Sequence, residues 1–313
     1  MRITILYNPI SGRGAAEASA QAASTALVQA GHDVELEQTR RDEWTGNGEV
    51  DPWTARDLVV IAGGDGAMRG AARRAAEAGV AVYHLPMGTE NLFAREFGMR
   101  RDAAQLVQAV SEWRIETVDM GEANGLTFLL MASVGLDANV VHDLAANRKS
   151  AISHWTYLGP VARQLISWRS GILRVETDGR AVVDGLKGMV VIANAKQYGW
   201  RLDPAREADM TDGLLDVVFL PARSGVGVAR WVVRCKTGRQ MKCKGAVHAR
   251  GEHVRVTSET PFLFQLDGDP PPPMKGKEDG IGTAKRVNVL DARVRRGSLR
   301  VLRPRGEVGT LSG

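Results

Sequence analysis

The first 120 residues alternate strand-length runs with alanine-rich stretches, and this alternation constrains the fold more than any other feature. The strand patterns cover residues 2–7, 33–38, 57–62 and 80–85. Helices are expected at about 15–30 and 67–78, and near 90–97 and 102–113. Repeated strand–helix units of this length imply a parallel sheet with helices on both faces. We therefore expect an α/β nucleotide-binding domain over residues 1–120.

After residue 114 the pattern changes to short strands separated by turns. These strands are predicted at 114–119, 126–133, 171–177, 188–193, 215–220, 253–257 and 262–266. One helical stretch, at roughly 140–168, interrupts them, and Pro270–Pro273 form a stiff insert in a polar loop that ends near Lys285. Such a series predicts an antiparallel β-sandwich domain over 121–294. The segment at about 295–313 is a candidate for returning to the first domain.

The glycines give the first domain a candidate site. Glycine makes up 35 of 313 residues, about 11% against an average near 7%. Three glycine-containing loops directly follow predicted strands: Asn8–Gly12, Gly63–Gly66 and Pro86–Thr89. In a parallel sheet all three meet at the carboxyl edge, where backbone N–H groups can bind phosphate. No Gly-Lys-Ser/Thr and no first-strand GxGxxG is present, so an uncommon phosphate-binding arrangement is predicted.

Bulk properties limit the setting of the protein. Forty-one Lys and Arg residues against 36 Asp and Glu give a net charge of +5, which favours polyphosphates, acidic lipid or nucleic acid as partners. Two cysteines are too few for a disulfide scaffold and favour a reducing cytoplasm. The apolar start, Ile3–Tyr7, is too short for a signal peptide, and the longest apolar run, Leu126–Leu136, is about half a membrane span. A soluble, cytoplasmic protein is expected.

Five motifs occur in the order found in one family of kinases. They are Asn8-Pro9-x-Ser11-Gly12, Gly63-Gly64-Asp65-Gly66, Pro86-x-Gly88-Thr89-x-Asn91-x-Phe93-Ala94-Arg95, Asp212-Gly213-Leu214-Leu215-Asp216 and Asp267-Gly268-Asp269. Together they resemble the lipid kinases that include diacylglycerol, sphingosine and ceramide kinases, and most of all the small soluble bacterial members. Each motif alone is weak, but the resemblance extends over almost the whole chain.

The resemblance implies a set of site residues and cofactors. It implies that ATP is bound by Asn8, Ser11, Thr39, Gly63, Gly64, Asp65, Gly66, Gly88 and Thr89, with Asp65 as an indirect anchor for Mg²⁺. Asp267 and Asp269 match the family's Asp-Gly-Glu and are the implied catalytic carboxylates. Asp212, with the backbone carbonyls of Asp209 and Leu214, matches a structural magnesium site of some bacterial members.

The proposed chemistry needs little covalent work by the protein. Phosphoryl transfer depends on alignment and charge neutralisation, which backbone N–H groups and Mg²⁺ supply. A carboxylate then accepts the proton of the attacking lipid hydroxyl, and the sequence does not say whether Asp267 or Asp269 does so. Taken alone, Asp-Gly-Asp is a turn between strands.

Some residues depart from the family pattern. Ala67–Gly70 replace the usual Thr-x-Asn-Glu, Leu92 stands where many members have Asp, and Asp269 replaces Glu. These changes bear on catalytic efficiency more than on the fold. Arg69 either adds a positive charge near phosphate or is an ordinary solvated helix residue.

The leading hypothesis is an ATP-dependent lipid kinase acting on a hydroxyl of a diacylglycerol- or sphingoid-like lipid. The alternatives are a catalytically weak nucleotide-binding regulator and a kinase of a soluble substrate, since NAD kinases share Gly-Gly-Asp-Gly. The basic stretches 223–250 and 285–305 are either solvated faces or peripheral contacts with an anionic membrane. Nucleic acid is not expected, because no binding module or aromatic pattern accompanies these charges. The lipid substrate and a homodimeric state remain open.

Overall fold

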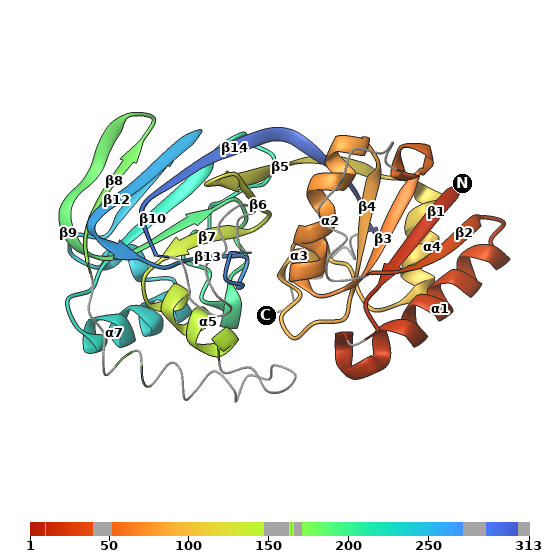
Figure 1. Cartoon of the computed structure of the whole chain (residues 1–313), viewed down its shortest axis with the longest axis horizontal. Coiled ribbons are helices and arrows are strands. Elements are labelled where there is room, and N and C mark those ends of the chain that lie inside the picture. Colours follow the sequence, from red (N-terminus) through yellow and green to blue (C-terminus); the bar gives the residue numbers. More distant parts are fainter. Residues whose placement is uncertain are drawn as a thin grey trace. The chain divides into compact units, whose positions relative to one another are not determined.

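The chain folds into two compact units. The computed structural model describes residues 1–9, 11–39, 52–146, 163, 165, 171–271 and 286–305. One unit comprises Met1–Val118 together with the chain from Gly297 onward, and the other is Asp119–Arg296 (Figure 1). Strands β5 (Ile115–Ala123) and β14 (Val287–Leu302) each contribute residues to both units, so the backbone passes between them twice.

The first unit is built on a parallel sheet. Its strands are β1 (Arg2–Tyr7), β2 (Asp33–Gln38), β3 (Leu58–Gly63) and β4 (Ala81–Pro86), and the end of β14 pairs with β4. The order is β14-β4-β3-β1-β2, and all neighbours are parallel. The sequence prediction of these four strands is correct to within one residue at each end.

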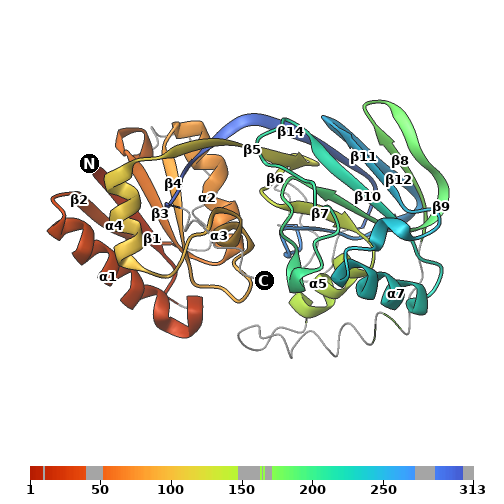
Figure 2. The ribbon, with the colours of Figure 1, turned by 180° about the vertical axis from the view of Figure 1, so that it is seen from behind.

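Helices cover both faces of this sheet. The chain moves in one direction from β1 to β2 and in the opposite direction from β3 to β4. Right-handed crossovers therefore place α1 (Ala15–Gln29) and α2 (Asp65–Ala78) on opposite faces. α4 (Ala103–Glu112) packs against α1, and the short α3 (Leu92–Phe97) packs against α2. Figure 2 shows the unit from behind, with α4 in front of the sheet. Because both faces are covered, all six residues of β3 are buried.

The second unit consists of antiparallel strands in two layers. The first layer contains β8 (Ile172–Thr177), β12 (His253–Phe262), β14, β5 and β6 (Leu126–Phe128). The second contains β11 (Val247–Gly251), β10 (Leu215–Pro221), β7 (Met131–Val134) and β13 (Phe264–Leu266). The long β9 (Arg180–Ala193) joins them, because its first half pairs with β8 and its second half with β10 and β7.

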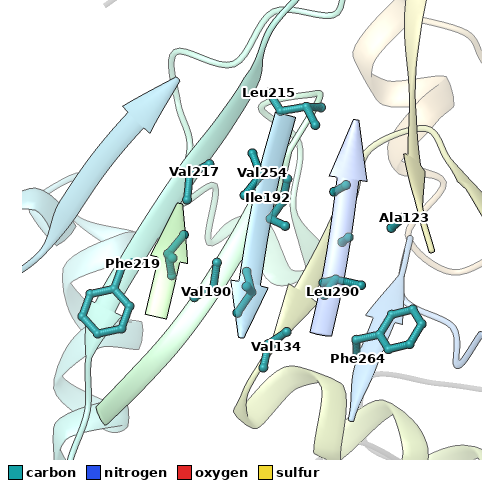
Figure 3. Close-up of a cluster of buried hydrophobic side chains, with 14 of the residues drawn as sticks. Ala123, Val134, Val190, Ile192, Leu215, Val217, Phe219, Val254, Phe264 and Leu290 are labelled. Atoms are coloured by element: carbon teal, nitrogen blue, oxygen red, sulfur yellow. The ribbon is translucent and has the colours of Figure 1, made fainter. Parts of the chain in front are cut away.

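Apolar side chains from both layers fill the core of the second unit. Ile192 and Val217 come from one layer and Val254 and Leu290 from the other, and all four are at most 1% exposed (Figure 3). Alternate residues of each strand enter this core, which is the arrangement of a β-sandwich. The predicted fold class, a parallel α/β domain followed by an antiparallel β-sandwich, is confirmed.

Several elements of the second unit differ from the sequence prediction. The single strand expected at 126–133 is interrupted between β6 and β7, and helix α7 (Gly225–Lys236) and strands β11 and β14 were not predicted. Of the helix expected at 140–168, α5 (Leu136–Ala146) and the helical residues 163 and 165 are described, and the remainder lies outside the described residues. So does the predicted loop beyond Pro271, up to Lys285.

Short 3₁₀ turns complete the described structure. They are η1 (Ser11–Gly14), η2 (Pro52–Ala55), η4 (Gly199–Arg201) and η5 (Gln240–Lys242). None of the helices within the described ranges combines the length and the apolar character needed to cross a membrane.

Candidate functional site

The three glycine loops of the first unit meet at one edge of the parallel sheet. Strand order reverses between β1 and β3, so the connections after these strands leave toward opposite faces, as they do at the ligand sites of open α/β sheets. The N–H of Met87, after β4, donates to the carbonyl of Gly63 at the end of β3 over 2.7 Å. A Cβ atom placed on Gly12, after β1, would lie 3.1 Å from the Met87 carbonyl oxygen. The structure thus brings the three predicted loops together.

Two of these loops approach each other through glycine backbone. A Cβ atom on Gly88 would lie 3.0 Å from the Cα of Gly64 and 2.8 Å from Oδ1 of Asn91. A Cβ atom on Gly64 would lie 3.5 Å from the Cα of Gly88, an ordinary contact. Helix α2 begins directly after Gly64, and the first N–H groups of a helix have no partner within it. The arrangement therefore offers backbone donors and a positive helix end to an anion.

Asp65 organises this edge as a helix cap. Its two carboxylate oxygens accept from the N–H groups of Leu92, at 2.9 Å, and Phe93, at 3.0 Å, which begin α3. Asn91, in the left-handed region at φ 47°, accepts from the Gly88 N–H at 2.7 Å and donates to the Gly88 carbonyl at 2.8 Å. The carboxylate that we expected to act as an indirect metal anchor thus holds α3 and the loop before it.

A buried histidine supports the same loops and was not predicted from the sequence. Nε2 of His84, on β4, lies 2.9 Å from the carbonyl oxygen of Gly63, which also accepts from Met87. Complete burial lowers the pKa of His84 to about 4, so at neutral pH the imidazole is uncharged and Nε2–H is the donor. The one available sequence signal is a histidine inside an otherwise apolar strand.

The other predicted ATP ligands of the first unit follow the same strand ends. The N–H of Ser11 donates to the Asn8 carbonyl at 2.9 Å, which closes the turn after β1. Thr39, after β2, donates its N–H at 2.8 Å and its hydroxyl at 3.2 Å to the carbonyl of Tyr7. Thr89 is exposed beside Gly88. All of these positions therefore lie at the carboxyl ends of neighbouring strands.

In the second unit, the predicted catalytic triplet forms a tight turn. Leu266 and Asp269 exchange two backbone hydrogen bonds of 2.9 Å, and the turn residues between them are Asp267, at φ 50°, and Gly268, at φ 84°. Positive φ at both central positions is the condition for a type I′ hairpin turn, and Asp-Gly is a preferred pair there. The backbone of this triplet therefore forms a turn, as the sequence alone predicts.

The two carboxylates of the turn have different surroundings. Asp267 is buried and accepts three backbone N–H groups, from Leu129 and Leu130 at 2.8 Å each and from Met131 at 3.0 Å. These donors are available because the chain leaves strand geometry between β6 and β7. Asp269 is partly exposed. Three N–H donors satisfy the acceptor oxygens of Asp267 and fix the turn to the neighbouring strand.

A buried polar network supports this turn from the other side. The Gln265 side chain accepts from the Gly268 N–H and donates to the Ser133 hydroxyl, both over 2.7 Å. The hydroxyls of Ser133 and Tyr198 both donate to Oδ2 of Asp137, at the start of α5. Burial raises the pKa of Tyr198 well above its usual value, so its hydroxyl stays protonated. No sequence motif marks these residues, which come from four separate segments.

The predicted structural magnesium loop is held by an arginine. Asp212 accepts from the Leu214 N–H at 3.0 Å through one oxygen, and Arg250 forms an ion pair with the other. The same guanidinium reaches the buried Asp216 at 3.3 Å. The carboxylate of Asp209 is occupied by hydrogen bonds within its own turn, and no group of three His, Cys, Asp or Glu residues with metal-site spacing occurs in the described part of the chain. The Asp212 carboxylate thus has an arginine and an N–H as partners, and the magnesium site of Asp212 with the carbonyls of Asp209 and Leu214 stays a prediction.

Other buried polar groups brace the same loop. His248 lies within hydrogen-bond reach of Asp216, and that hydrogen bond is the main cause of its raised pKa. Asp119, buried on β5, accepts from the Gly213 N–H at 2.7 Å. The side-chain amide of Asn194 donates to the carbonyls of Asp119 and Leu129 at 2.9 and 2.8 Å. None of these three braces was predicted from the sequence.

Comparison with known proteins identifies the family. Residues 2–123 match the family described as diacylglycerol kinase catalytic domain, and residues 131–296 match the YegS C-terminal NAD kinase beta sandwich-like domain. The chain belongs to the diacylglycerol kinase family. It is therefore a phosphotransferase of a family that uses ATP as phosphate donor and usually a divalent metal, and the predicted resemblance is confirmed.

Several relatives match this protein over most of their length. It is 28% identical over 298 residues to a diacylglycerol kinase of Mycobacterium tuberculosis, covering 91% of this chain and 94% of the relative. It is 23% identical over 272 residues to one of Bacillus subtilis, covering 86% and 89%. A structure described as a diacylglycerol kinase of Bacillus anthracis superposes with a TM-score of 0.69 at 16% identity, covering 96% of both chains. At that identity the superposition shows a shared fold.

Proposed function

We propose that this protein is an ATP-dependent lipid kinase that transfers the γ-phosphate of ATP to a hydroxyl of a diacylglycerol- or sphingoid-like lipid. The observation that carries the proposal is the contact of the three glycine loops, where strand order reverses and α2 begins. Family membership supports the kinase class, and the names of the relatives support a lipid acceptor.

Backbone donors are proposed to hold the phosphates of ATP. The N–H groups of Gly64–Gly66 lie at the start of α2, and Gly88, whose own N–H donates to Asn91, brings Thr89 close to Gly63 and Gly64. Asn8, Ser11 and Thr39 lie at the adjoining strand ends. Preformed donors of this kind bind anionic oxygens without reorganising during the reaction. Mg²⁺ bound with ATP would neutralise further charge on the phosphates.

The two carboxylates of the turn are proposed to have separate roles. Asp269 is partly exposed and accepts the proton of the lipid hydroxyl, whereas Asp267 anchors the turn through its three backbone donors. Proton acceptance by a positioned carboxylate contributes about 10²- to 10⁴-fold to the rate. The Gln265 network holds the turn so that Asp269 keeps one orientation.

A second candidate function is nucleotide binding with little turnover, for sensing or regulation. Ala67–Gly70 form the first turns of α2, where the family often has a hydroxyl, an amide and a carboxylate. Their loss removes polar groups next to the loop that is proposed to bind phosphate. A kinase of a soluble substrate is the third candidate.

Radiolabelled ATP with Mg²⁺ and a broad lipid panel, including total lipid extract, tests the proposal. Labelled lipid is expected, with turnover that depends on Asp269. If no lipid is labelled while a related active kinase works in the same assay, the proposal fails. ATP binding by calorimetry without any labelled product would then favour the nucleotide-binding regulator, and a labelled water-soluble acceptor would favour the third candidate.

A further inference from the structure

Helix α7 and the turn η5 form a basic surface of the second unit. Helix α7 lies at the same end of that unit as α5 in both views (Figures 1 and 2), and η5 contacts α7. Residues 223–250, which include both elements, contain eight Lys or Arg residues and no Asp or Glu. This stretch of the sequence therefore carries positive charge that no acidic residue within it offsets.

One face of α7 is buried, and the opposite face carries two exposed valines. Val228, Trp231 and Cys235 pack into the unit, at the spacing of one helical face. Val226 and Val233 are 72% and 64% exposed. They are seven residues apart, so they lie two turns from each other on the same outward face.

Exposed apolar side chains are concentrated at this surface. Seven large apolar residues are exposed within the described ranges, and three of them, Val226, Val233 and Met241, fall on α7 and η5. A single exposed apolar residue is ordinary, whereas exposed apolar residues that share a face, as Val226 and Val233 do on α7, mark a surface of interaction.

Basic side chains surround these apolar residues. Arg230 is exposed on the same helical face, between Val226 and Val233, and Arg223, Lys242 and Lys244 are exposed next to the helix. None of these four forms an ion pair with an acidic side chain of the described residues. Their charges are therefore available to an anionic partner.

We propose that the exposed face of α7 and η5 docks on a lipid bilayer that contains anionic lipid. Val226, Val233 and Met241 enter the interface between headgroups and acyl chains, and the surrounding cations contact the headgroups. This inference rests on the proposed function, because a kinase of membrane lipid must reach its substrate at a bilayer.

The apolar residues distinguish a bilayer from nucleic acid. A nucleic acid would gain from the arginines and lysines but not from valines exposed between them, and it would favour exposed aromatic side chains for stacking. Trp231, the one aromatic residue of residues 223–250, is buried. An amphipathic helix whose outward face combines exposed valines with basic residues matches an interfacial membrane helix.

Vesicle sedimentation of the full chain tests the proposal. Vesicles of phosphatidylcholine alone and of phosphatidylcholine with phosphatidylglycerol are compared at low and high salt. Binding is expected for the phosphatidylglycerol vesicles, weaker at high salt, and reduced at least tenfold by Val226→Glu, Val233→Glu or Arg230→Glu. Val28→Glu, at a helix valine 54% exposed in the first unit, and Arg180→Glu, at an exposed arginine of β9, serve as matched controls and should bind like the unaltered protein.

Three results would overturn the docking surface. The first is unchanged vesicle binding in the α7 variants, and the second is equal binding to both kinds of vesicle. The third is a single-stranded oligonucleotide that displaces the protein from the vesicles and binds it only when Arg230 is present. Val226→Ser and Val233→Ser repeat the test if a glutamate variant fails to fold. Activity on a short-chain diacylglycerol in solution should be unchanged in the α7 variants, so a failure of docking is distinguishable from a failure of the kinase proposal.

Discussion

At the scale of single residues, Asp267 and Asp269 should respond differently to the same substitution. Asp269→Asn is expected to reduce turnover by about 10²- to 10⁴-fold without changing the melting temperature, because it removes only the proton acceptor. Asp267→Asn replaces one of the two acceptor oxygens by an amide NH₂, which leaves at least the buried N–H of Leu129 without an acceptor, at a cost of about 1–3 kcal/mol of folding stability. Lipid-kinase assays and thermal denaturation of both variants measure the two effects.

Asp184 provides the matched control for these two carboxylates. Its side chain is 71% exposed on β9, so Asp184→Asn should leave both turnover and melting temperature unchanged. If Asp269→Asn keeps full activity while a folded Asp267→Asn protein loses turnover, Asp267 and not Asp269 is the proton acceptor.

His84 is expected to make the protein sensitive to mild acid. Its pKa is lowered by burial from 6.5 to about 4, so the unfolded chain binds a proton before the folded chain does. Stability that is present above pH 6.5 is therefore lost as the pH falls toward 4, by roughly 3 kcal/mol for this residue. His84→Gln keeps a donor for the Gly63 carbonyl and cannot be protonated.

Melting temperatures between pH 7 and pH 4.5 compare the two proteins. The unaltered protein should lose more stability over this range than His84→Gln, whose remaining loss comes from other groups such as the buried His142. Parallel pH profiles would show that His84 does not titrate differently in the two states.

At the scale of secondary-structure elements, the sequence predicted best where local pattern and tertiary environment agree. Strands β1, β3 and β4 are apolar because helices cover both faces, and the length and spacing of all four strands are visible in the sequence. The three glycine loops could also be placed together, since the ends of parallel strands share one edge.

Where tertiary contacts overrule local pattern, the prediction failed. Residues 126–133 read as one strand, but the N–H groups of Leu129 and Leu130 bind Asp267, which is distant in sequence. Helix α7 contains Gly225, Gly227 and four valines, which have low helix propensity, so its burial through Trp231 decides its structure. The polar network of Asp137 likewise requires four segments that only the fold brings together.

The contact between the loops after β3 and β4 predicts different effects of two glycine substitutions. Gly88→Ala forces its Cβ against Gly64 and Asn91 and should lower both the melting temperature and the ATP affinity, at a cost of about 1–3 kcal/mol. Gly64→Ala has room against the protein, so it should keep the melting temperature while weakening ATP binding. Calorimetric titration with Mg-ATP and thermal denaturation test both. Normal ATP affinity in the two variants would place the phosphates elsewhere.

The ion pairs between β11 and the loop at Asp212 predict how the protein responds to divalent cations. With Arg250 in place, Mg²⁺ or EDTA should not change the melting temperature in the absence of ATP. Arg250→Gln leaves Asp212 without its cation and Asp216 with His248 alone, and should cost about 1–3 kcal/mol, part of which added Mg²⁺ restores. Arg293→Gln, at an exposed ion pair with Asp291, is the control. A Mg²⁺ response of the unaltered protein would show that this loop binds a cation alongside Arg250.

At the scale of the whole molecule, each unit has its own core, yet β14 contributes to both. Leu290 is fully buried in the sandwich, whereas Leu299, Val301 and Leu302 are fully buried in the first unit. There the strand pairs with β4, with Val301 opposite Val82. The last part of the described chain thus completes the sheet that carries the glycine loops.

Two leucines on this one strand should therefore destabilise different units. Leu302→Ala and Leu290→Ala each remove a fully buried side chain, at a cost of about 2–5 kcal/mol. Leu302→Ala is expected to speed hydrogen exchange in β3 and β4 and to weaken ATP binding, because the glycine loops follow these strands. Leu290→Ala should speed exchange in β12, its neighbour in the sandwich, and leave ATP affinity unchanged. Hydrogen exchange followed by mass spectrometry resolves the two patterns. Equal acceleration in both units by either variant would mean that the chain opens as one cooperative whole, with β5 and β14 transmitting the loss.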